Sequence, residues 1–200
     1  MTLPRPTLPL APNPPIIELP SGYPLLRFYD PSRGPWYVHR FFGPISDARF
    51  DHQPPPPALH PTRSVWYAGT SLRGAVAETF GKIGFVDRSC GRKIVKVRIV
   101  GSIEVLDLLG TGARKLKLTQ EIATTTDYGL CQSYARAFYD QYTGIEGIRC
   151  RGREIGSINV VLTDRAEMTC LAPEVDEEMT HPCIWPRLAR AIRDCSLEII

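Results

Sequence analysis

Four residues in the first half of the chain carry side chains that could do chemistry together. They are two cations, an aromatic ring and a carboxylate, namely Arg27, Arg49, Tyr67 and Glu78. Two arginines can clamp a pyrophosphate or an inorganic phosphate, because each guanidinium group presents its donors in a planar fork. An aromatic ring can stack on a heterocycle, and a carboxylate can stabilise the positive charge that develops when a glycosidic bond breaks. The set predicts a pocket that holds a dinucleotide and strains its glycosidic bond.

Each of these residues also has a purely structural interpretation. Arg27 lies inside a short apolar run, so without a ligand it must form a salt bridge or extend its head group to the surface, and the same holds for Arg49. Trp66 and Tyr67 point to opposite faces of an expected strand, and both rings could pack in the core. Glu78 could be an ordinary solvated helix residue. Spacing by itself does not choose between these interpretations.

The elements that position the four side chains follow from the hydrophobic pattern. Apolar strands are expected over residues 25–29 and 64–69. The second strand leads into a helix that Thr70 or Ser71 caps and that runs through Phe80, because apolar residues recur there at helical spacing. The sequence therefore predicts that the aromatic ring and the carboxylate come from one strand–helix unit.

Small residues flank the carboxylate in this helix. Glu78 falls off the apolar face, beside Gly74 and Gly81. Glycine inside a helix costs about 1 kcal/mol relative to alanine, so Gly74 indicates a close approach by another group. We expect open space beside the carboxylate, which suits a ligand better than a salt bridge.

The remaining elements alternate irregularly along the chain. Strands are expected over residues 93–99, 103–108, 148–150 and 157–163, and helices over 115–122, from Asp127 until Gly144 and Gly147 end it, and over 188–195, with a solvated acidic turn at 176–178. Such irregular alternation favours an α+β fold over a regular parallel α/β sheet.

Length and composition are typical of a single globular domain. The chain has 200 residues, of which 43% are hydrophobic. Residues 1–21 are rich in proline and predict an extended arm that lies along the surface or a partner, followed by one domain over residues 22–200. A second proline run, Pro54 to Pro57, predicts a rigid loop near the pocket.

Charge and motif content exclude several classes of protein. The net charge is +3, and the basic residues form no block, so no direct nucleic-acid binding is expected. No stretch approaches the roughly 20 apolar residues of a membrane span, and no secretion signal is apparent, so a cytoplasmic protein is expected. Walker, Rossmann, HExxH and GxSxG motifs are missing from the sequence, which argues against standard nucleotide hydrolases, dehydrogenases and zinc peptidases.

The six cysteines form no CxxC pair, and no histidine is spaced to complete a zinc site. We therefore expect free, partly buried thiols and no bound metal. A catalytic cysteine would need a paired histidine, which no local pattern offers.

Taken in order, several segments resemble the RES domain, the toxin component of RES–Xre toxin–antitoxin pairs. The segments are Leu26-Arg27-Phe28, Ala48-Arg49-Phe50-Asp51 (where the family tends to have Gly-Arg-Trp/Phe-Asn), Val65-Trp66-Tyr67-Ala68-Gly69-Thr70-Ser71 leading to Ala77-Glu78, Gly147-Ile148-Arg149-Cys150-Arg151-Gly152-Arg153, and Asn159-Val160-Val161-Leu162. The likeness covers residues 22 to 165. Each motif is loose, but their order and spacing together are fairly specific.

This resemblance implies a fold like that of ADP-ribosyltransferase toxins, a split mixed or antiparallel sheet flanked by helices around an NAD cleft. Family members degrade NAD, some by phosphorolysis to nicotinamide and ADP-ribose 1″-phosphate with inorganic phosphate as co-substrate, and a few ADP-ribosylate a protein. Carried over residue by residue, Arg49 and Glu78 fill the family's arginine and glutamate positions, Tyr67 the aromatic position and Arg27 that of an early arginine. These four residues would bind NAD, with Glu78, Arg49 and Arg27 as the catalytic set.

The resemblance also implies a partner, a small Xre-type helix-turn-helix antitoxin that covers the cleft and carries any DNA binding. Neither a metal nor a membrane is implied. Whether the protein is a monomer or a homodimer stays open.

One position departs from the family. Where the family often reads Arg-Tyr-Arg-Ser-Arg, this chain has Arg149-Cys150-Arg151-Gly152-Arg153, so Gly152 occupies the serine position among the NAD-binding residues. Ser157, five residues on, would substitute if the turn folds back. The change leaves three alternatives to an NAD phosphorylase: a protein ADP-ribosyltransferase, an NAD glycohydrolase, and a non-catalytic module that binds a nucleotide or a partner. The basic run over residues 149–154 could likewise be a phosphate-facing loop or a soluble turn.

Overall fold

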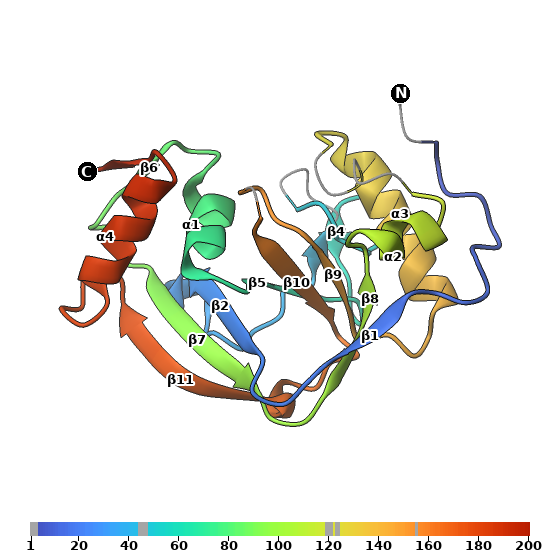
Figure 1. The fold of residues 1–200 in the computed structure, drawn as a ribbon, viewed down its shortest axis with the longest axis horizontal. Coiled ribbons are helices and arrows are strands. Elements are labelled where there is room, and N and C mark those ends of the chain that lie inside the picture. The colour runs from blue at the N-terminus through green and yellow to red at the C-terminus, as the bar shows by residue number, and fades with distance from the viewer. Residues whose placement is uncertain (1–3, 44–47, 119–121, 123–124, 155) are drawn as a thin grey trace.

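The fold is organised by an eight-stranded, curled sheet (Figure 1). The structure, a computed structural model, describes residues 4–43, 48–118, 122, 125–154 and 156–200. In spatial order the strands are β1 (Ile16–Leu19), β8 (Ile103–Asp107), β9 (Gly147–Arg151), β10 (Ile158–Thr163), β5 (Val65–Gly69), β2 (Pro24–Tyr29), β7 (Lys93–Ile99) and β11 (Leu171–Glu178). Neighbouring strands are antiparallel except for β8 and β9, which are parallel. The mixed sheet and its helices confirm the expected α+β class.

Two groups of helices stand over the two ends of this sheet (Figure 1). The first group, α1 (Leu72–Phe80) and α4 (Trp185–Asp194), packs with apolar residues of β2 and β7. The second, α2 (Thr111–Lys115) and α3 (Tyr128–Gln141), packs with apolar residues of β8, β9 and β10. A third apolar cluster around Trp66 covers the opposite face of the sheet. The three clusters together bury apolar side chains on both faces of the sheet.

Short elements complete the chain. They are the strand pairs β3 (Phe42–Gly43) with β4 (Ala58–Leu59) and β6 (Phe85–Val86) with β12 (Glu198–Ile199), and the 3-10 helices Pro31–Arg33 and Met168–Cys170.

The sheet is split between β2 and β5. These strands share a single register pair, Leu26 with Gly69, whereas β2 pairs with β7 over six residues from Pro24 to Tyr29. Because hydrogen-bonded strands hold their neighbours about 4.8 Å apart, a break in the ladder is what allows a cavity to open within a sheet. The two strands predicted to carry Arg27 and Tyr67 thus diverge on either side of one opening.

Most predicted elements are confirmed. Strands β2, β5, β7, β8, β9 and β10 correspond to the strands expected over 25–29, 64–69, 93–99, 103–108, 148–150 and 157–163. Helices α1, α3 and α4 correspond to the helices expected from Thr70 or Ser71 through Phe80, from Asp127, and over 188–195. Ser71 is the N-cap of α1, since its hydroxyl accepts from the Gly74 N–H at 3.1 Å, and Asp127 caps α3 in the same way through Leu130. Helix α3 ends at Gln141, before the expected glycines.

The acidic segment 176–178 was predicted to be a turn, and this prediction is wrong. These residues form the end of β11, which pairs with β7 along its whole length. Asp176 pairs with Lys93, and Glu174 pairs with Lys96 and with Arg98. Cations of β7 thus pair with Glu174 and Asp176 across the strand pair, which local composition does not reveal.

The helix predicted over residues 115–122 is also wrong. Helix α2 covers Thr111–Lys115, and Lys117 has φ 58°. A left-handed residue cannot continue a right-handed helix, and α2 ends at Lys115, the first residue of the predicted segment. Residues 119–121 lie outside the described part of the chain.

The proline-rich arm lies along α3. The hydroxyl of Tyr134 donates to the Pro4 carbonyl at 2.8 Å, and that of Tyr142 donates to the Ala11 carbonyl at 2.8 Å. The side chain of Gln141 accepts from the Leu10 N–H at 2.6 Å and donates to its carbonyl at 3.0 Å. Extended proline-rich backbone leaves its carbonyls free, so polar side chains of a helix can bind it.

The sheet begins earlier than the sequence indicated. Residues Ile16–Leu19 form β1, an edge strand paired with β8, and Leu19 is in the core. This strand lies within residues 1–21, which were expected to be an extended arm, and its alternation of exposed and buried side chains fits a pleated edge. In the part of the chain that is described, no helix has the length and apolar character needed to cross a membrane.

Candidate functional site

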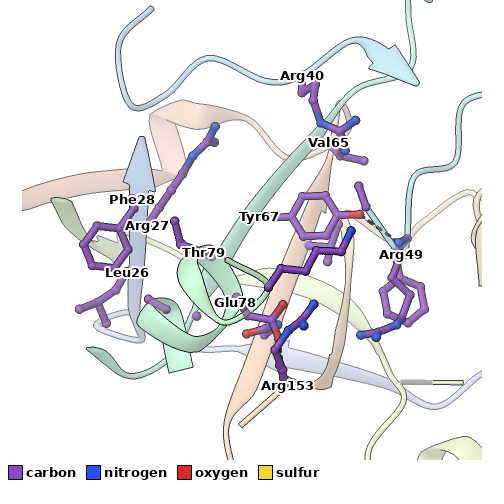
Figure 2. A pocket seen from close by; sticks show the side chains of 18 of the residues that line it. Leu26, Arg27, Phe28, Arg40, Arg49, Val65, Tyr67, Glu78, Thr79 and Arg153 are labelled. Atoms are coloured by element: carbon purple, nitrogen blue, oxygen red, sulfur yellow. Dashed lines mark hydrogen bonds between the residues drawn. The ribbon is translucent and has the colours of Figure 1, made fainter. Parts of the chain in front are cut away.

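A cavity of about 550 Å³ opens where the sheet is split (Figure 2). Its walls come from β2, β5 and β10, from α1, from the segment 48–50 and from the first turn of α3. Its volume lies in the range of small-molecule sites. The proline run over residues 54–57 is exposed and is not part of the cavity wall.

The cavity brings together the four residues singled out from the sequence. Arg27 extends from β2, Arg49 from the segment before β5, Tyr67 from β5 and Glu78 from α1 (Figure 2). In that view Arg27 and Arg49 stand on opposite sides of Tyr67. Gly152, the fifth predicted site residue, is absent from the cavity's described lining, although the next residue, Arg153, belongs to it.

The lining is strongly cationic. Among its described residues are the basic side chains of Arg27, Arg33, Arg40, Arg49, Lys82, Arg92 and Arg153, and one carboxylate, that of Glu78. A concave surface lined mostly by one sign of charge raises the local concentration of ligands of opposite sign. The cavity is therefore built for an anion, with a single negative group placed inside it.

Arg27 is a partly buried cation that forms no ion pair within the described residues. Its guanidinium group lies over the Trp66 ring, 5.3 Å from the centroid, and donates to the Val38 carbonyl at 3.4 Å. Burial and the neighbouring charge of Arg40 lower the pKa of Arg27 to about 10. The structural alternative, a salt bridge, is not realised, and an anionic ligand would compensate the buried charge.

Arg49, on the other side of Tyr67, is likewise a cation without an ion pair among the described residues. Its Nε atom is buried without a partner, and its terminal nitrogen donates weakly to the Thr125 carbonyl at 3.4 Å. The guanidinium carbon lies 5.2 Å from the centroid of the Tyr128 ring, and the Lys82 ammonium lies 5.5 Å from the same ring. Cations held against aromatic faces keep donors for a ligand, because a ring accepts no conventional hydrogen bond.

Tyr67 is anchored at its hydroxyl and presents its ring to the cavity. The hydroxyl accepts from the Phe50 N–H at 3.0 Å and donates to the buried carboxylate of Asp51 at 3.1 Å. Arg40 pairs with Asp51 and lies over the ring, 5.9 Å from the centroid. Burial, and then the charge of Asp51, raise the pKa of Tyr67 well above its ordinary value. The residue therefore suits packing against a ligand and not proton transfer.

The neighbour of Tyr67 is a core residue. Trp66 is fully buried on the other face of β5, and its indole N–H donates to the Trp36 carbonyl at 2.8 Å. The period of two along a strand thus sends one ring to the core and one to the cavity, which the sequence by itself left open.

Glu78 faces the cavity from α1, and its carboxylate accepts the backbone N–H of Arg153 (Figure 2). The cavity provides open space beside the carboxylate, but the room at Gly74 and Gly81 is filled by protein atoms. A Cβ atom on Gly74 would lie 3.0 Å from that of Ser157, and one on Gly81 would lie 3.1 Å from Cδ of Arg153. The turn between β9 and β10 fills the space that the two glycines leave and thereby reaches the carboxylate.

That turn also settles the arrangement around Gly152. The Gly152 N–H donates to the Ser157 carbonyl at 2.9 Å, so the turn folds back, and a Cβ atom on Gly152 would clash with the Ser157 hydroxyl. This hydroxyl is buried and donates to the Glu154 carbonyl at 2.6 Å. Ser157 therefore occupies the room of the missing side chain, but it stands behind the described cavity wall and does not line it.

The basic run 149–154 is divided between two roles. Arg149 pairs with Asp107 of β8 at 3.4 Å, and Arg73 of α1 pairs with Glu154. Arg153 is the member of this run that lines the cavity.

Several cavity residues were not singled out from the sequence. They are Arg33, Arg40, Lys82, Arg92, Tyr128, Arg153 and Asn159. Asn159 and Arg153 lie inside segments that carry the resemblance, and that is the signal that could have found them. The others come from segments without a motif.

The thiol in the cavity wall is not a nucleophile. Burial, and then the charge of Glu78, raise the pKa of Cys150 to about 12. A thiol becomes reactive as a thiolate, so this residue is inert near neutral pH. No group of His, Cys, Asp and Glu side chains suited to a metal ion occurs in the described ranges.

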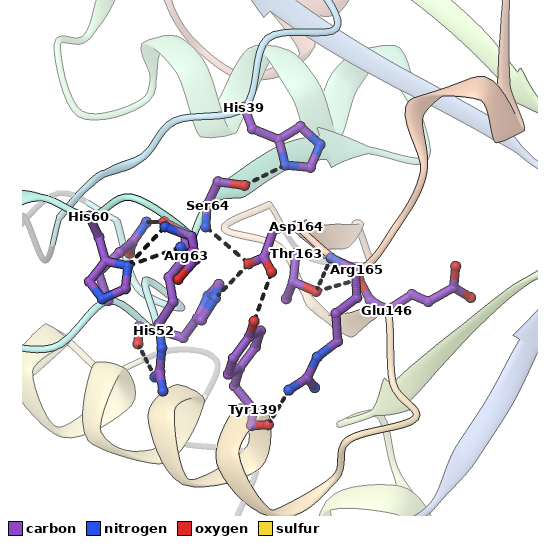
Figure 3. Close-up of polar contacts among 12 residues, drawn as sticks. His39, His52, His60, Arg63, Ser64, Tyr139, Glu146, Thr163, Asp164 and Arg165 are labelled. Atoms are coloured by element: carbon purple, nitrogen blue, oxygen red, sulfur yellow. Dashed lines mark hydrogen bonds and ion pairs between the residues drawn. The ribbon is translucent and has the colours of Figure 1, made fainter.

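A second polar cluster lies away from the cavity, around Asp164 (Figure 3). Its carboxylate accepts from the Tyr139 hydroxyl at 2.7 Å, the Ser64 N–H at 3.1 Å and His52 Nε2 at 3.3 Å. Burial favours the neutral acid, but these hydrogen bonds outweigh it and hold the pKa of Asp164 well below its ordinary value. Arg165 lies 3.7 Å from the centroid of the Tyr139 ring and donates to the Tyr139 carbonyl at 2.8 Å. The Asp164 carboxylate is thus paired internally, although Nδ1 of His52 is buried without a partner among the described residues.

Comparison with solved structures supports the fold. A chain of the crystal structure of the M. tuberculosis MbcT–MbcA toxin–antitoxin complex is similar, with a TM-score of 0.60 over 86% of this chain and 92% of that chain at 15% identity. At this identity the likeness concerns the fold alone. No curated protein gives a significant match.

The sequence itself also matches a family model, described as RES domain, over residues 27–185. This match covers well over half of the 200 residues and includes the cavity-forming strands and α1. The chain therefore belongs to the RES domain family.

Proposed function

We propose that this RES domain protein binds NAD in the cavity and cleaves its nicotinamide–ribose bond by phosphorolysis, giving nicotinamide and ADP-ribose 1″-phosphate. The observation that carries the proposal is one carboxylate, Glu78, set in a cavity with a tyrosine ring and many cations. An anionic dinucleotide needs the cations, and a positively charged transition state needs the carboxylate.

The two sides of the cavity can hold two separate anions. Arg27 and Arg49 stand on opposite sides of Tyr67 (Figure 2), and neither forms an ion pair with a described carboxylate. One cationic side would bind the pyrophosphate of NAD and the other the attacking inorganic phosphate. Two anion positions favour phosphorolysis over hydrolysis, because water needs no cation to bind it.

In the proposed reaction the bond between the ribose C1 atom and the nicotinamide nitrogen breaks, and its electron pair neutralises the pyridinium ring. Glu78 stabilises the oxocarbenium character that develops at the ribose, and the backbone N–H of Arg153 holds the carboxylate in place. A phosphate oxygen then forms the new bond to C1. The ring of Tyr67 packs against the nicotinamide, and its tethered hydroxyl keeps it in position.

Gly152 favours a second candidate function, a nucleotide-binding module without catalysis. The family's serine would add a hydrogen bond near the substrate, and loss of one transition-state donor lowers a rate about 10²–10³-fold. Protein ADP-ribosylation and NAD hydrolysis use the same bond cleavage with another acceptor, so they are the alternatives within the enzyme class.

Purified protein incubated with NAD, with and without inorganic phosphate, tests the proposal when the products are separated by mass. We expect phosphate-dependent loss of NAD and formation of a phosphorylated ADP-ribose. Loss that does not need phosphate would identify hydrolysis or transfer instead. Folded protein that binds NAD without consuming it would replace the enzyme by the binding module.

We further propose that an antitoxin controls the activity. The similar crystal structure is of a toxin–antitoxin complex, and a family of NAD-degrading toxins needs an inhibitor. The partner would be a small Xre-type helix-turn-helix protein that covers the cavity. Co-expression with the product of the neighbouring gene should restore NAD levels and growth, and a partner that leaves NAD depletion unchanged would contradict this.

A further inference from the structure

Asn159 is a buried polar residue in the cavity wall to which the proposed reaction gives no role. It lies on β10, lines the cavity and is 8% exposed. Its register partners are Cys150 on β9 and Gly69 on β5, which also line the cavity. Asn159 thus belongs to the floor of the cavity and is held there by strands on both sides.

The side chain of Asn159 is not satisfied within the described residues. Its Oδ1 atom is buried and has no hydrogen-bond partner, so the Nδ2 atom is the polar end that the cavity can reach. Buried polar side chains nearly always have partners, and an exception requires an explanation. Nδ2 also has no hydrogen-bond partner among the described residues, so it is a donor that a ligand in the cavity can use.

The neighbourhood of Gly152 explains why no protein group serves Asn159. A Cβ atom on Gly152 would lie 3.1 Å from Oδ1, but glycine offers no side chain there. The nearby hydroxyl of Ser157 already donates to the Glu154 carbonyl at 2.6 Å. The backbone turn therefore leaves Asn159 without a donor or an acceptor.

Asn159 and Glu78 approach the same short segment of chain. The Glu78 carboxylate accepts the N–H of Arg153, and Asn159 abuts the preceding residue, Gly152. Both side chains line the same cavity, which thus presents a carboxylate, which accepts hydrogen bonds, and an amide NH₂ group, which donates them. A hydroxyl is the group that matches both, because it donates one proton and accepts through its lone pairs.

We propose that Asn159 is a substrate-binding residue that donates from Nδ2 to a ribose hydroxyl whose own proton goes to Glu78. This inference rests on the proposed function, because it takes the ribose beside Glu78 to be the one next to the scissile bond. It assigns the pair to the recognition of a ribonucleotide with a free hydroxyl, and it makes Asn159 a determinant of specificity.

ADP-ribose and ADP are suitable probes, because they share the adenosine and the pyrophosphate and differ in the second ribose. Affinities of both are measured by calorimetry for the wild-type chain and for Asn159→Ala. We expect the variant to lose at least 10-fold in affinity for ADP-ribose and less than 2-fold for ADP. Asn159→Asp should lose more than Asn159→Ala for ADP-ribose, because it adds a second negative charge beside Glu78.

Thr163→Ala is the matched control. Thr163 lies on the same strand, is equally buried and bonds to the Glu146 carbonyl at 3.0 Å, away from the cavity. Its substitution should leave both affinities unchanged. Thermal unfolding of each variant shows whether the fold persists, and Asn159→Ser serves if the alanine variant does not fold.

Two results would overturn the inference. One is equal affinity of wild type and Asn159→Ala for ADP-ribose, and the other is an equal loss for ADP-ribose and ADP, which would mark a structural role. Failure of the proposed function is separate and visible: the wild-type protein would then consume no NAD and bind neither probe, and Asn159 would have no such substrate.

Discussion

The cavity and the Asp164 cluster are made from the same residue types, but their charged side chains have different partners. In the Asp164 cluster a carboxylate receives three hydrogen bonds, and Arg63 pairs with Asp140 while it lies 4.7 Å from the centroid of the Tyr139 ring. In the cavity Arg27 and Arg49 lie against rings and find no described carboxylate. Charges that a protein pairs internally stabilise its fold, whereas charges that it leaves without a counter-ion mark the place of a ligand.

The largest expected effect is on the carboxylate of the cavity. Glu78→Gln keeps an acceptor for the Arg153 N–H but removes the negative charge, so NAD turnover should fall at least 10²–10³-fold with the fold intact. Steady-state rates and thermal unfolding measure the two effects. Glu104→Gln changes an exposed glutamate and is the control that should leave turnover unchanged. Wild-type turnover by Glu78→Gln would remove the assignment.

Smaller effects are expected when a cation of the cavity or a cation of the Asp164 cluster is replaced by alanine. Arg49→Ala should weaken NAD binding by about 10–100-fold, since hydrogen bonds to charged groups contribute about 1.5–3 kcal/mol, and it should change stability little. Arg63→Ala should lower the stability of the protein and leave NAD binding nearly unchanged. Its ion pair with Asp140 and its bond to the His52 carbonyl at 3.1 Å are internal to the fold. Calorimetric binding and urea unfolding give both numbers. The comparison fails if the two variants behave alike.

The turn behind Glu78 predicts an effect on stability. Gly152→Ser should destabilise the protein by about 1–3 kcal/mol, because its Cβ atom would clash with the Ser157 hydroxyl. The double variant Gly152→Ser with Ser157→Gly moves the hydroxyl to the family's position and should recover most of that loss. Urea unfolding of the two single variants and the double variant tests this. Additive losses in the double variant would show that the two positions do not share one space.

The smallest effect is the pH dependence of the Asp164 cluster. His39, which contacts the Ser64 hydroxyl at 2.8 Å, has its pKa lowered to about 4 by burial and by the charge of Arg27. The unfolded chain binds a proton at this residue below its ordinary pKa of 6.5, whereas the folded chain does not until about pH 4. Stability should therefore fall, on the order of 2 kcal/mol or less, as the pH drops from 6.5 to 4.

Urea unfolding across that pH range measures the effect, and His39→Gln should flatten the curve. Asp164 adds a loss at still lower pH, since its pKa is depressed and the bonds to its carboxylate weaken as it is protonated. A decline of the same size in His39→Gln would assign it to other groups.

Much of the site could be predicted from local pattern. The run Val65–Gly69 followed by a capped helix places Tyr67 and Glu78 on one strand–helix unit, and alternation sends Trp66 to the core. The order of loose motifs then indicated the RES family and named Arg27 and Arg49. These features are set by neighbours within a few residues, which is why sequence suffices for them.

Other features came from contacts between distant segments. β7 and β8 follow each other in sequence but lie at separate places in the sheet. The acidic end of β11 is a strand that pairs with β7, whose cations pair with Glu174 and Asp176. The arm binds α3 through side chains more than a hundred residues away. No local pattern contains these partners.

The sequence by itself thus determined the chemistry available, namely the cations, the ring, the carboxylate and the elements that carry them. The tertiary structure decided which groups stay without a partner. It filled the room at Gly74 and Gly81 with the β9–β10 turn and put Ser157 in the room that Gly152 leaves. It also left the Asn159 side chain, in the floor of the cavity, without a partner among the described residues. The reason is physical: residue type sets what a side chain can bond to, but only packing across the split sheet decides whether the protein or a ligand supplies the bond.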